Sequence, residues 1–146
     1  MFNLIKEIKS KEGVLHFQRW NILSTPWFSI YFHKIYKADE DKHLHDHPWN
    51  YTSICLKGEF TEEREFQTNL KNLGILEEHI PYSVVETFRV VRRKAESFHK
   101  IKKLLTPEVW TLFFVGKRRR EWGYDVDGKW IDNVTYRKMK NEGLLK

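Results

Sequence analysis

The stretch "KHLHDHPWNYTSICLKG", residues 42–58, carries the pattern that decides the fold. It opens with histidines at alternate positions and then alternates between apolar and polar residues as far as Gly58. Pro48 disfavours a helical backbone at His47, and side chains two residues apart in an extended chain point the same way. The stretch therefore predicts β-structure in which His45 and His47 share one face.

Two histidines on one face of a strand form a candidate metal site. Imidazole binds zinc, iron, copper and nickel alike, so the spacing does not name the metal. A third ligand is needed, and two histidines compete for that place: His99, which lies between two strand-like segments, and His33, on the polar face of its own strand. In an extended chain His43 would point the same way as His45 and His47, but it lies two residues before the pair. Three protein ligands and an open position are typical of catalytic sites, whereas a solvated loop is the alternative interpretation.

Strand-like segments recur along the rest of the chain. Aromatic and β-branched residues are concentrated in residues 27–36, 51–57, 82–91 and 108–115. Residues 124–131 predict a hairpin, because Asp127-Gly128 suits a two-residue turn that needs positive φ. Many short strands separated by turns predict an all-β sandwich or barrel, with an α+β domain as the alternative.

The two ends and one connection depart from this pattern. Residues 2–12 predict a short N-terminal helix, because their Leu and Ile residues share a helical face and Gly13 follows as a stop. Residues 67–80 are polar and mixed, which predicts a connecting loop or a short helix. The last ten or so residues predict a basic C-terminal tail.

The composition limits the class of protein. The chain has 146 residues, 40% of them hydrophobic, which suits a single domain over residues 1–146. No apolar run approaches the roughly 20 residues that span a bilayer, and the N-terminus lacks the features of a secretory signal. Cys55 is the only cysteine, so we expect a reducing, cytoplasmic setting.

The chain is basic, with 26 Lys and Arg against 20 Asp and Glu, a formal net charge of +6. The basic residues gather in residues 89–94, 99–103 and 116–121. Such clusters either bind nucleic acid or another anion, or simply keep the protein soluble. No recognised nucleic-acid motif accompanies them.

Several arginines are candidates for binding an anion inside a barrel. In an alternating strand, Arg118 and Arg120 point one way and Arg119 the other, so at least one could enter the barrel and hold a carboxylate or phosphate bidentately. Arg89 and Arg92 are similar candidates. An inward arginine beside a metal would favour a small anionic substrate, whereas a charged, solvated edge strand is the alternative.

Three further residues of the opening stretch have structural interpretations. Asp46 should point away from the two histidines that flank it and cap a turn or orient a neighbour. Trp49 either walls a pocket or packs in the core. Cys55 should be a small buried residue of an alternating strand.

The opening stretch resembles the first motif of the cupin superfamily, whose members are small double-stranded β-helix (jelly-roll) proteins. That motif has the form G-x5-H-x-H-x3-E-x6-G. His45, His47 and Gly58 stand at the matching offsets, whereas Tyr51 takes the place of the glutamate and Asp39 that of the first glycine.

The second cupin motif keeps only its histidine, as His99 in "SFHKI". Together with "GKRRREWGY" farther on, the chain is similar to a subgroup of small, largely uncharacterised microbial and phage cupins. The resemblance spans roughly residues 27–131. It implies an all-β jelly-roll barrel.

The resemblance also implies a divalent transition metal (iron, zinc, nickel or manganese) held by His45, His47 and His99. Tyr51 would supply a phenolate ligand or a hydrogen bond, or would leave its position to water. Two glutamates that follow the motif, Glu59 and Glu63, are further candidates to reach the site.

A three-histidine site without glutamate resembles that of the thiol dioxygenases and some other small dioxygenases of the superfamily. We therefore expect a metal-dependent oxidoreductase of dioxygenase type acting on a small, anionic molecule, with Tyr51, Arg118 and Arg120 as catalytic candidates. An isomerase, epimerase or hydrolase on the same fold is one alternative, and a non-catalytic binding or accessory module is another. The expected partners are a small-molecule ligand and a second copy of the chain, with nucleic acid as the partner in the accessory alternative.

Overall fold

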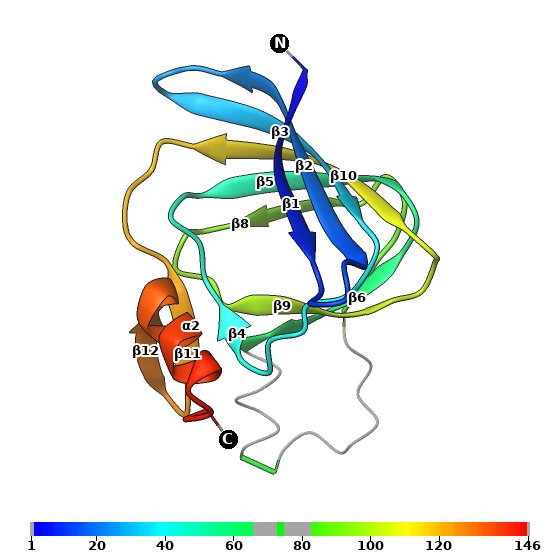
Figure 1. Ribbon diagram of the computed structural model, residues 1–146. Coiled ribbons are helices and arrows are strands. Elements are labelled where there is room, and N and C mark those ends of the chain that lie inside the picture. Colours follow the sequence, from blue (N-terminus) through cyan, green and yellow to red (C-terminus); the bar gives the residue numbers. More distant parts are fainter. Residues whose placement is uncertain (1, 66–72, 75–82, 146) are drawn as a thin grey trace.

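Two antiparallel β-sheets lie face to face and enclose the core (Figure 1). The computed structural model describes residues 2–65, 73–74 and 83–145. One sheet has six strands in the order β1-β2-β3-β10-β5-β8, with bounds β1 Asn3–Lys9, β2 Leu15–Ser24, β3 Phe28–Ile35, β10 Val109–Gly116, β5 Tyr51–Lys57 and β8 Val90–Arg93. The other has six in the order β12-β11-β4-β9-β6-β7, with bounds β12 Lys129–Asp132, β11 Gly123–Val126, β4 Leu44–His45, β9 His99–Leu104, β6 Phe60–Arg64 and β7 Ser83–Val85. The expected all-β jelly-roll architecture is confirmed.

The strands expected in residues 27–36, 51–57 and 108–115 are present as β3, β5 and β10. They form the centre of the first sheet, where β10 pairs with β3 on one side and β5 on the other. The expected hairpin is also present, as β11 and β12. Its turn residues Asp127 and Gly128 have φ values of 52° and 81°, the backbone that the Asp-Gly pair favours.

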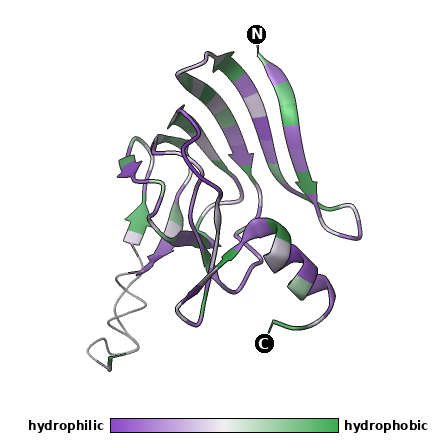
Figure 2. Cartoon of the chain, turned by 90° about the vertical axis from the view of Figure 1, so that its left-hand side faces the viewer, coloured by the Kyte–Doolittle hydropathy of each residue, from purple (hydrophilic) through white to green (hydrophobic). Residues whose placement is uncertain are grey.

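The prediction of an N-terminal helix is wrong, because residues 3–9 form the edge strand β1. β1 pairs antiparallel with β2, and the register shifts after Leu4 and after Ile8. These irregularities break the two-residue alternation, which is why the spacing of the apolar residues suggested a helix. Pairing with β2 satisfies the backbone, whereas an isolated helix of this length is marginal in water. β1 mixes apolar and polar residues along its length, and all seven are exposed (Figure 2).

The basic C-terminal tail is instead largely the helix α2, Asn133–Asn141. The side chain of Asp132 caps its first turn by accepting hydrogen bonds from the backbone N–H groups of Val134 and Thr135. Tyr136 anchors the helix, since it is 2% exposed and its ring stacks on Tyr124 at a centroid distance of 3.6 Å. Among the described residues, no helix has the length and apolar character needed to cross a membrane.

The single strand expected in residues 82–91 is divided between the two sheets. β7 and β8 are separated by a turn in which Phe88 has a φ of 68°. This turn bonds to the end of β5: the N–H of Phe88 donates to the carbonyl of Cys55 at 2.6 Å. The loop or helix expected in residues 67–80 lies almost entirely outside the described residues.

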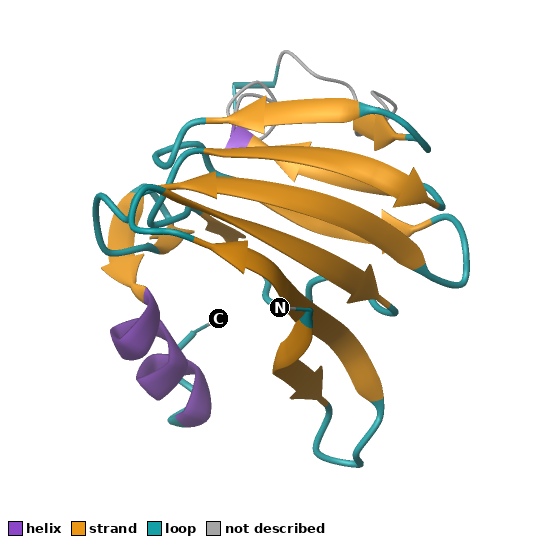
Figure 3. Ribbon diagram, turned by 90° about the horizontal axis from the view of Figure 1, so that it is seen from above, coloured by secondary structure: helices purple, strands orange, loops and turns teal. Residues whose placement is uncertain are grey.

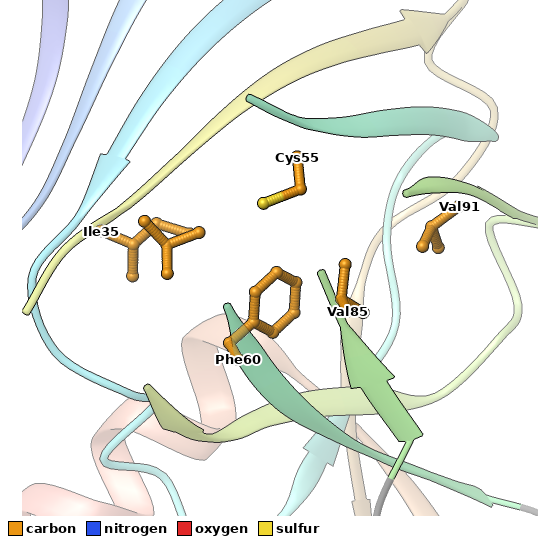
Figure 4. Close-up of a cluster of buried hydrophobic side chains, with 6 residues drawn as sticks. Ile35, Cys55, Phe60, Val85 and Val91 are labelled. Carbon is orange, nitrogen blue, oxygen red and sulfur yellow. The ribbon is translucent and has the colours of Figure 1, made fainter. Parts of the chain in front are cut away.

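The core between the sheets contains two apolar clusters. The larger one comprises Ile35, Cys55, Phe60, Val85, Val91 and Val109, contributed by both sheets (Figure 4). Cys55 is 1% exposed, so the expectation of a small buried residue is confirmed. The smaller cluster contains Tyr51, Phe113 and Val115, with Tyr31 and Trp49 packed against it, so Trp49 packs in the core.

Gly58, the last residue of the opening stretch, should tolerate no side chain. It has a φ of 85°, and a Cβ there would overlap the backbone carbonyl of Glu108 and the hydroxyl of Thr106. Gly13 is a matched control because its φ is 81° and nothing lies within 4 Å of its Cβ position. We expect Gly13→Ala to cost about 1 kcal/mol of unfolding free energy from backbone strain, and Gly58→Ala about 2 kcal/mol more from the overlap. Urea denaturation measures both, and equal losses would contradict the steric argument.

Candidate metal centre

Three histidines from separate segments meet at one place between the sheets. His45 ends β4 and lies directly opposite His99 of β9 in the antiparallel register. Directly opposite residues of an antiparallel pair present their side chains on the same face. His47 lies in the connection from β4 to β5, where its N–H donates to the carbonyl of Ala95 at 2.9 Å. The proline that follows His47 favours the extended backbone of this connection.

The ring nitrogens of His45, His47 and His99 lie close enough to hold one metal ion. One ligand nitrogen from each ring lies within 4.8 Å of the others. The Nε2 atoms of His47 and His99 are 2.7 Å apart, and the ring centroids are separated by 4.8 to 5.3 Å. No other group of His, Cys, Asp and Glu side chains in the described part of the chain meets this criterion. The structure thus brings His99, rather than His33, to the pair.

The electrostatics of the cluster suit metal binding. Burial, followed by the nearby His99, lowers the pKa of His45 to about 4. Burial also holds the pKa of His47 well below its ordinary value, and the two neighbouring histidines add to that effect. Both imidazoles are therefore neutral at neutral pH, which is the form that binds a metal. The three rings fit a divalent transition metal by donor type and spacing.

Tyr51 lies against the same rings. Its hydroxyl is 3.2 Å from Nε2 of His99, and its ring centroid is 4.7 Å from that of His47. The side chain is 5% exposed, and this burial raises the pKa of its phenol far above the ordinary value. In the structure Tyr51 is thus a neutral phenol within hydrogen-bond reach of His99.

Comparison with known proteins places this geometry in a fold family. The sequence matches no protein-family model and no curated protein. A cupin-2 domain protein from Rhodospirillum rubrum is similar in structure with a TM-score of 0.60 and 14% identity, over 99% of this chain and 90% of that protein. The chain has the cupin fold.

Two further solved structures show a likeness of fold at low identity. A protein from Ralstonia eutropha described as a putative mannose-6-phosphate isomerase has a TM-score of 0.52 and 13% identity, over 66% of this chain and 81% of its own. The Fe(II) form of HppE has a TM-score of 0.56 and 11% identity over 78% of this chain, which spans 56% of the HppE chain. At these identities the likeness is one of fold.

A buried carboxylate, Glu62, lies beside the candidate centre, and sequence reasoning missed it in favour of its neighbours. Glu62 is 3% exposed, and its Oε2 lies 3.4 Å from Nδ1 of His99. Its Oε1 accepts a 2.8 Å hydrogen bond from Arg93. Burial by itself would raise the pKa of Glu62, but the hydrogen bonds and charges of His99 and Arg93 together lower it to about 2. Glu62 is therefore an ionised carboxylate on the far side of a candidate ligand.

The alternation within β6 is the signal that identifies Glu62. Phe60 is buried in the core, and a residue two positions along a strand faces the same way. Glu63 faces outward, where its carboxylate lies 3.7 Å from Lys100 and from Lys102. Glu59 is exposed at the start of the strand. Neither of the two expected glutamates is in the histidine cluster.

Asp46 points away from the histidines, as expected, and organises the hairpin beside them. Its carboxylate is 1% exposed and accepts hydrogen bonds from Arg120, from the N–H of Gly123 at 2.7 Å and from the indole N–H of Trp130 at 3.0 Å. The backbone N–H of Asp46 in turn donates to the carbonyl of Gly123. Asp46 thereby ties the segment between His45 and His47 to β11 and β12.

None of the five arginines singled out from the sequence contacts the histidine cluster in the described structure. Arg119 donates to the side chain of Asn50 and lies 3.7 Å from the carboxylate of Glu96. Arg118 is 57% exposed and pairs with Glu121, and Arg89 and Arg92 are exposed. Arg120 is directed to Asp46 and lies over the ring of Trp130. Other arginines do face the interior, among them Arg93, already described, Arg64 of β6, which stands opposite His99, and Arg19 on β2. The sequence reasoning missed Arg19 because it did not identify β2 as a strand.

The basic segment around residue 92 borders a shallow groove on the surface. Phe28, Thr52 and Phe114 form part of its wall, together with Arg92 and Lys94. None of the three histidines lines this groove. Tyr51 and Arg93 do line it, so the groove adjoins the residues around the candidate metal centre.

Proposed function

We propose that this cupin is a metal-dependent oxidoreductase of dioxygenase type that acts on a small anionic molecule. The observation that supports the proposal is the donor set: three imidazoles, shielded from solvent for the most part, within 4.8 Å and no carboxylate in the cluster, among the residues that the structure describes. Three imidazole ligands would leave room at a bound metal ion for a substrate.

When bound, iron(II) or a related divalent metal would supply a site at which substrate and oxygen are held and polarised. His45, His47 and His99 would be its ligands. Glu62 would orient the ring of His99 by accepting from Nδ1, which directs Nε2 toward the centre. Tyr51 would donate a hydrogen bond to a group bound beside His99, because its phenol keeps its proton. The rings of Tyr51 and Phe113, 4.5 Å apart, would exclude water from one side.

The metal content of the protein tests the proposal. Protein purified without an affinity tag should contain about one transition metal ion per chain, and the variant with His45, His47 and His99 all changed to alanine should contain almost none. His43→Ala is the matched control, since His43 lies in the same stretch but contacts Tyr136 instead. Mass spectrometry of the metals checks this, and an unchanged metal content in the triple variant would overturn the proposal.

The reaction type needs a second measurement. Uptake of dioxygen by the iron-loaded protein, tested with a panel of small carboxylic and phosphonic acids, should accompany turnover. A metal-dependent isomerase or hydrolase on the same fold would convert its substrate without taking up oxygen. Turnover in the absence of oxygen would therefore favour that second class of reaction.

A further inference from the structure

Arg19 lies on the inward face of the first sheet without an acidic partner. Four residues form one row across neighbouring strands of this sheet. Arg19 pairs with His33, His33 with Thr111, and Thr111 with Cys55. His33, Thr111 and Cys55 are all buried, so this row faces the interior. No carboxylate forms an ion pair with Arg19 among the residues described. A cation facing the interior without a counter-charge is costly unless something else compensates it.

The guanidinium of Arg19 is held in one orientation. Its Nε donates to Nε2 of His33 at 2.9 Å, and its Cζ lies 4.9 Å above the ring of Tyr31 and 5.7 Å from the ring of Phe17. Since Nε2 of His33 accepts, the proton of this ring is on Nδ1, which lies 3.4 Å from the hydroxyl of Thr111. These contacts use only the Nε edge. Neither terminal nitrogen of Arg19 makes a hydrogen bond to another described residue. Two such nitrogens form the fork with which an arginine binds a carboxylate or phosphoryl group.

A second cation lies opposite Arg19 in the sheet. Lys6 of β1 stands directly opposite Arg19 in the register, on the same face of the sheet. Lys6 is exposed on this edge strand, but partial desolvation and the charges of Arg19 and of Arg137 on α2 lower the pKa of its ammonium group. The β1–β2 hairpin and α2 lie on the same side of the molecule (Figure 3). Like charges placed directly opposite repel, and a bound anion would relieve this repulsion.

A short series of rings connects Arg19 to the candidate metal centre. The ring of His33, which holds Arg19, is 4.9 Å from the ring of Phe113. Phe113 is in turn 4.5 Å from Tyr51 and 6.3 Å from His47, measured between ring centroids. One series of ring contacts therefore links Arg19 to the candidate metal centre, and the charge of Arg19 is among the causes that lower the pKa of His47.

We propose that Arg19 is the anchor for the acid group of the substrate, a carboxylate or a phosphoryl group, with Lys6 and Arg137 adding positive charge around it. His33 is a positioning residue, which fixes the guanidinium through its Nε edge. The other end of the substrate would reach His45, His47 and His99. Only this last part rests on the proposed function, because the anion site is built from residues that do not include the three histidines.

Anion binding by the metal-free protein tests the inference. Propionate and inorganic phosphate are titrated at constant ionic strength while the Nε–H resonance of Arg19 is followed by NMR, with neutral propionamide as the uncharged probe. We expect both anions, but not propionamide, to move this resonance. Because the variants lack this resonance, isothermal titration calorimetry compares their dissociation constants with that of the wild type. Arg19→Gln should raise the dissociation constant by about tenfold or more, and Arg19→Lys by an intermediate factor, because lysine keeps the charge but not the fork.

Arg118→Gln is the matched control, since it removes the same charge from an exposed arginine that pairs with Glu121. Its dissociation constant should stay within about twofold of the wild type. Equal anion affinity in Arg19→Gln and wild type, or no response of the wild-type resonance, overturns the inference. If Arg19→Gln does not fold, the same comparison with Arg19→Lys decides.

Metal content measured on the same samples separates this inference from the proposed function. Arg19→Gln should keep its metal, because Arg19 contacts none of the three histidines. A protein that binds no metal but loses anion binding in Arg19→Gln would refute the metal-dependent function and support the anion site. If the protein binds metal and the wild type and Arg19→Gln have the same anion affinity, the metal-dependent function is supported and the anion site is refuted.

Discussion

Changing Glu62 to glutamine should weaken metal binding by about 10- to 100-fold, the usual effect of removing the carboxylate that orients a ligating histidine. The Oε2 atom of Glu62 lies 3.4 Å from Nδ1 of His99, on the side of the ring opposite the candidate metal position. Without the negative charge, His99 loses the group that favours a proton on Nδ1 and a free Nε2. Competition with a chelator of known affinity measures the change.

Stability should respond to Glu62 as well, because Arg93 would lose its partner. The side chains of Arg93 and Glu62 are 13% and 3% exposed, so the pair is largely shielded from water. Glu62→Ala should cost about 3 to 5 kcal/mol of unfolding free energy, since it leaves a buried charge uncompensated. Denaturant unfolding of the metal-free protein checks this separately from metal binding.

Glu121→Gln is the control for both measurements. Glu121 is 68% exposed and pairs with Arg118 on the surface, so its variant should match the wild type in metal affinity and closely in stability. If Glu62→Gln also binds metal as tightly as the wild type, Glu62 has no part in orienting His99.

Asp46→Asn should destabilise the protein by about 2 to 4 kcal/mol and weaken metal binding with it. The Asp46 carboxylate accepts from three donors, those of Arg120, Gly123 and Trp130. An asparagine can accept with one oxygen only, and its amide N–H group would face a donor, so buried donors are left unsatisfied. The hairpin of β11 and β12 would then hold the segment between His45 and His47 less firmly.

The indole N–H resonance of Trp130 provides a direct reading of this network, alongside urea unfolding. It should move in Asp46→Asn, because its acceptor changes. Asp127→Asn is the control in the same hairpin: asparagine tolerates the positive φ of 52° found there, so stability should hardly change. Equal stability of the two variants would show that the Asp46 network is unimportant.

Local patterns in the sequence predicted an all-β sandwich or barrel and the pair His45 and His47, and the resemblance to cupins added the jelly roll and His99 as the third ligand. The alternation in β3, β5 and β10 and the Asp-Gly turn between β11 and β12 are local patterns, and local patterns set local backbone geometry. His45 and His47 lie two residues apart, so their common face follows from the geometry of an extended chain. The helix expected at residues 2–12 was wrong because the irregular register of β1 disturbs the same alternation.

The rest of the site depends on which strands become neighbours, and this only the tertiary structure decided. His99 is 54 positions beyond His45 in the chain, yet the two are directly opposite in paired strands, whereas His33 pairs with Arg19 in the other sheet. Glu62 and Arg19 have no motif of their own, and their positions follow from strand pairing. A sequence pattern specifies the face on which a side chain lies, but the side chains opposite it come from distant segments, whose register is set by the packing of the whole barrel.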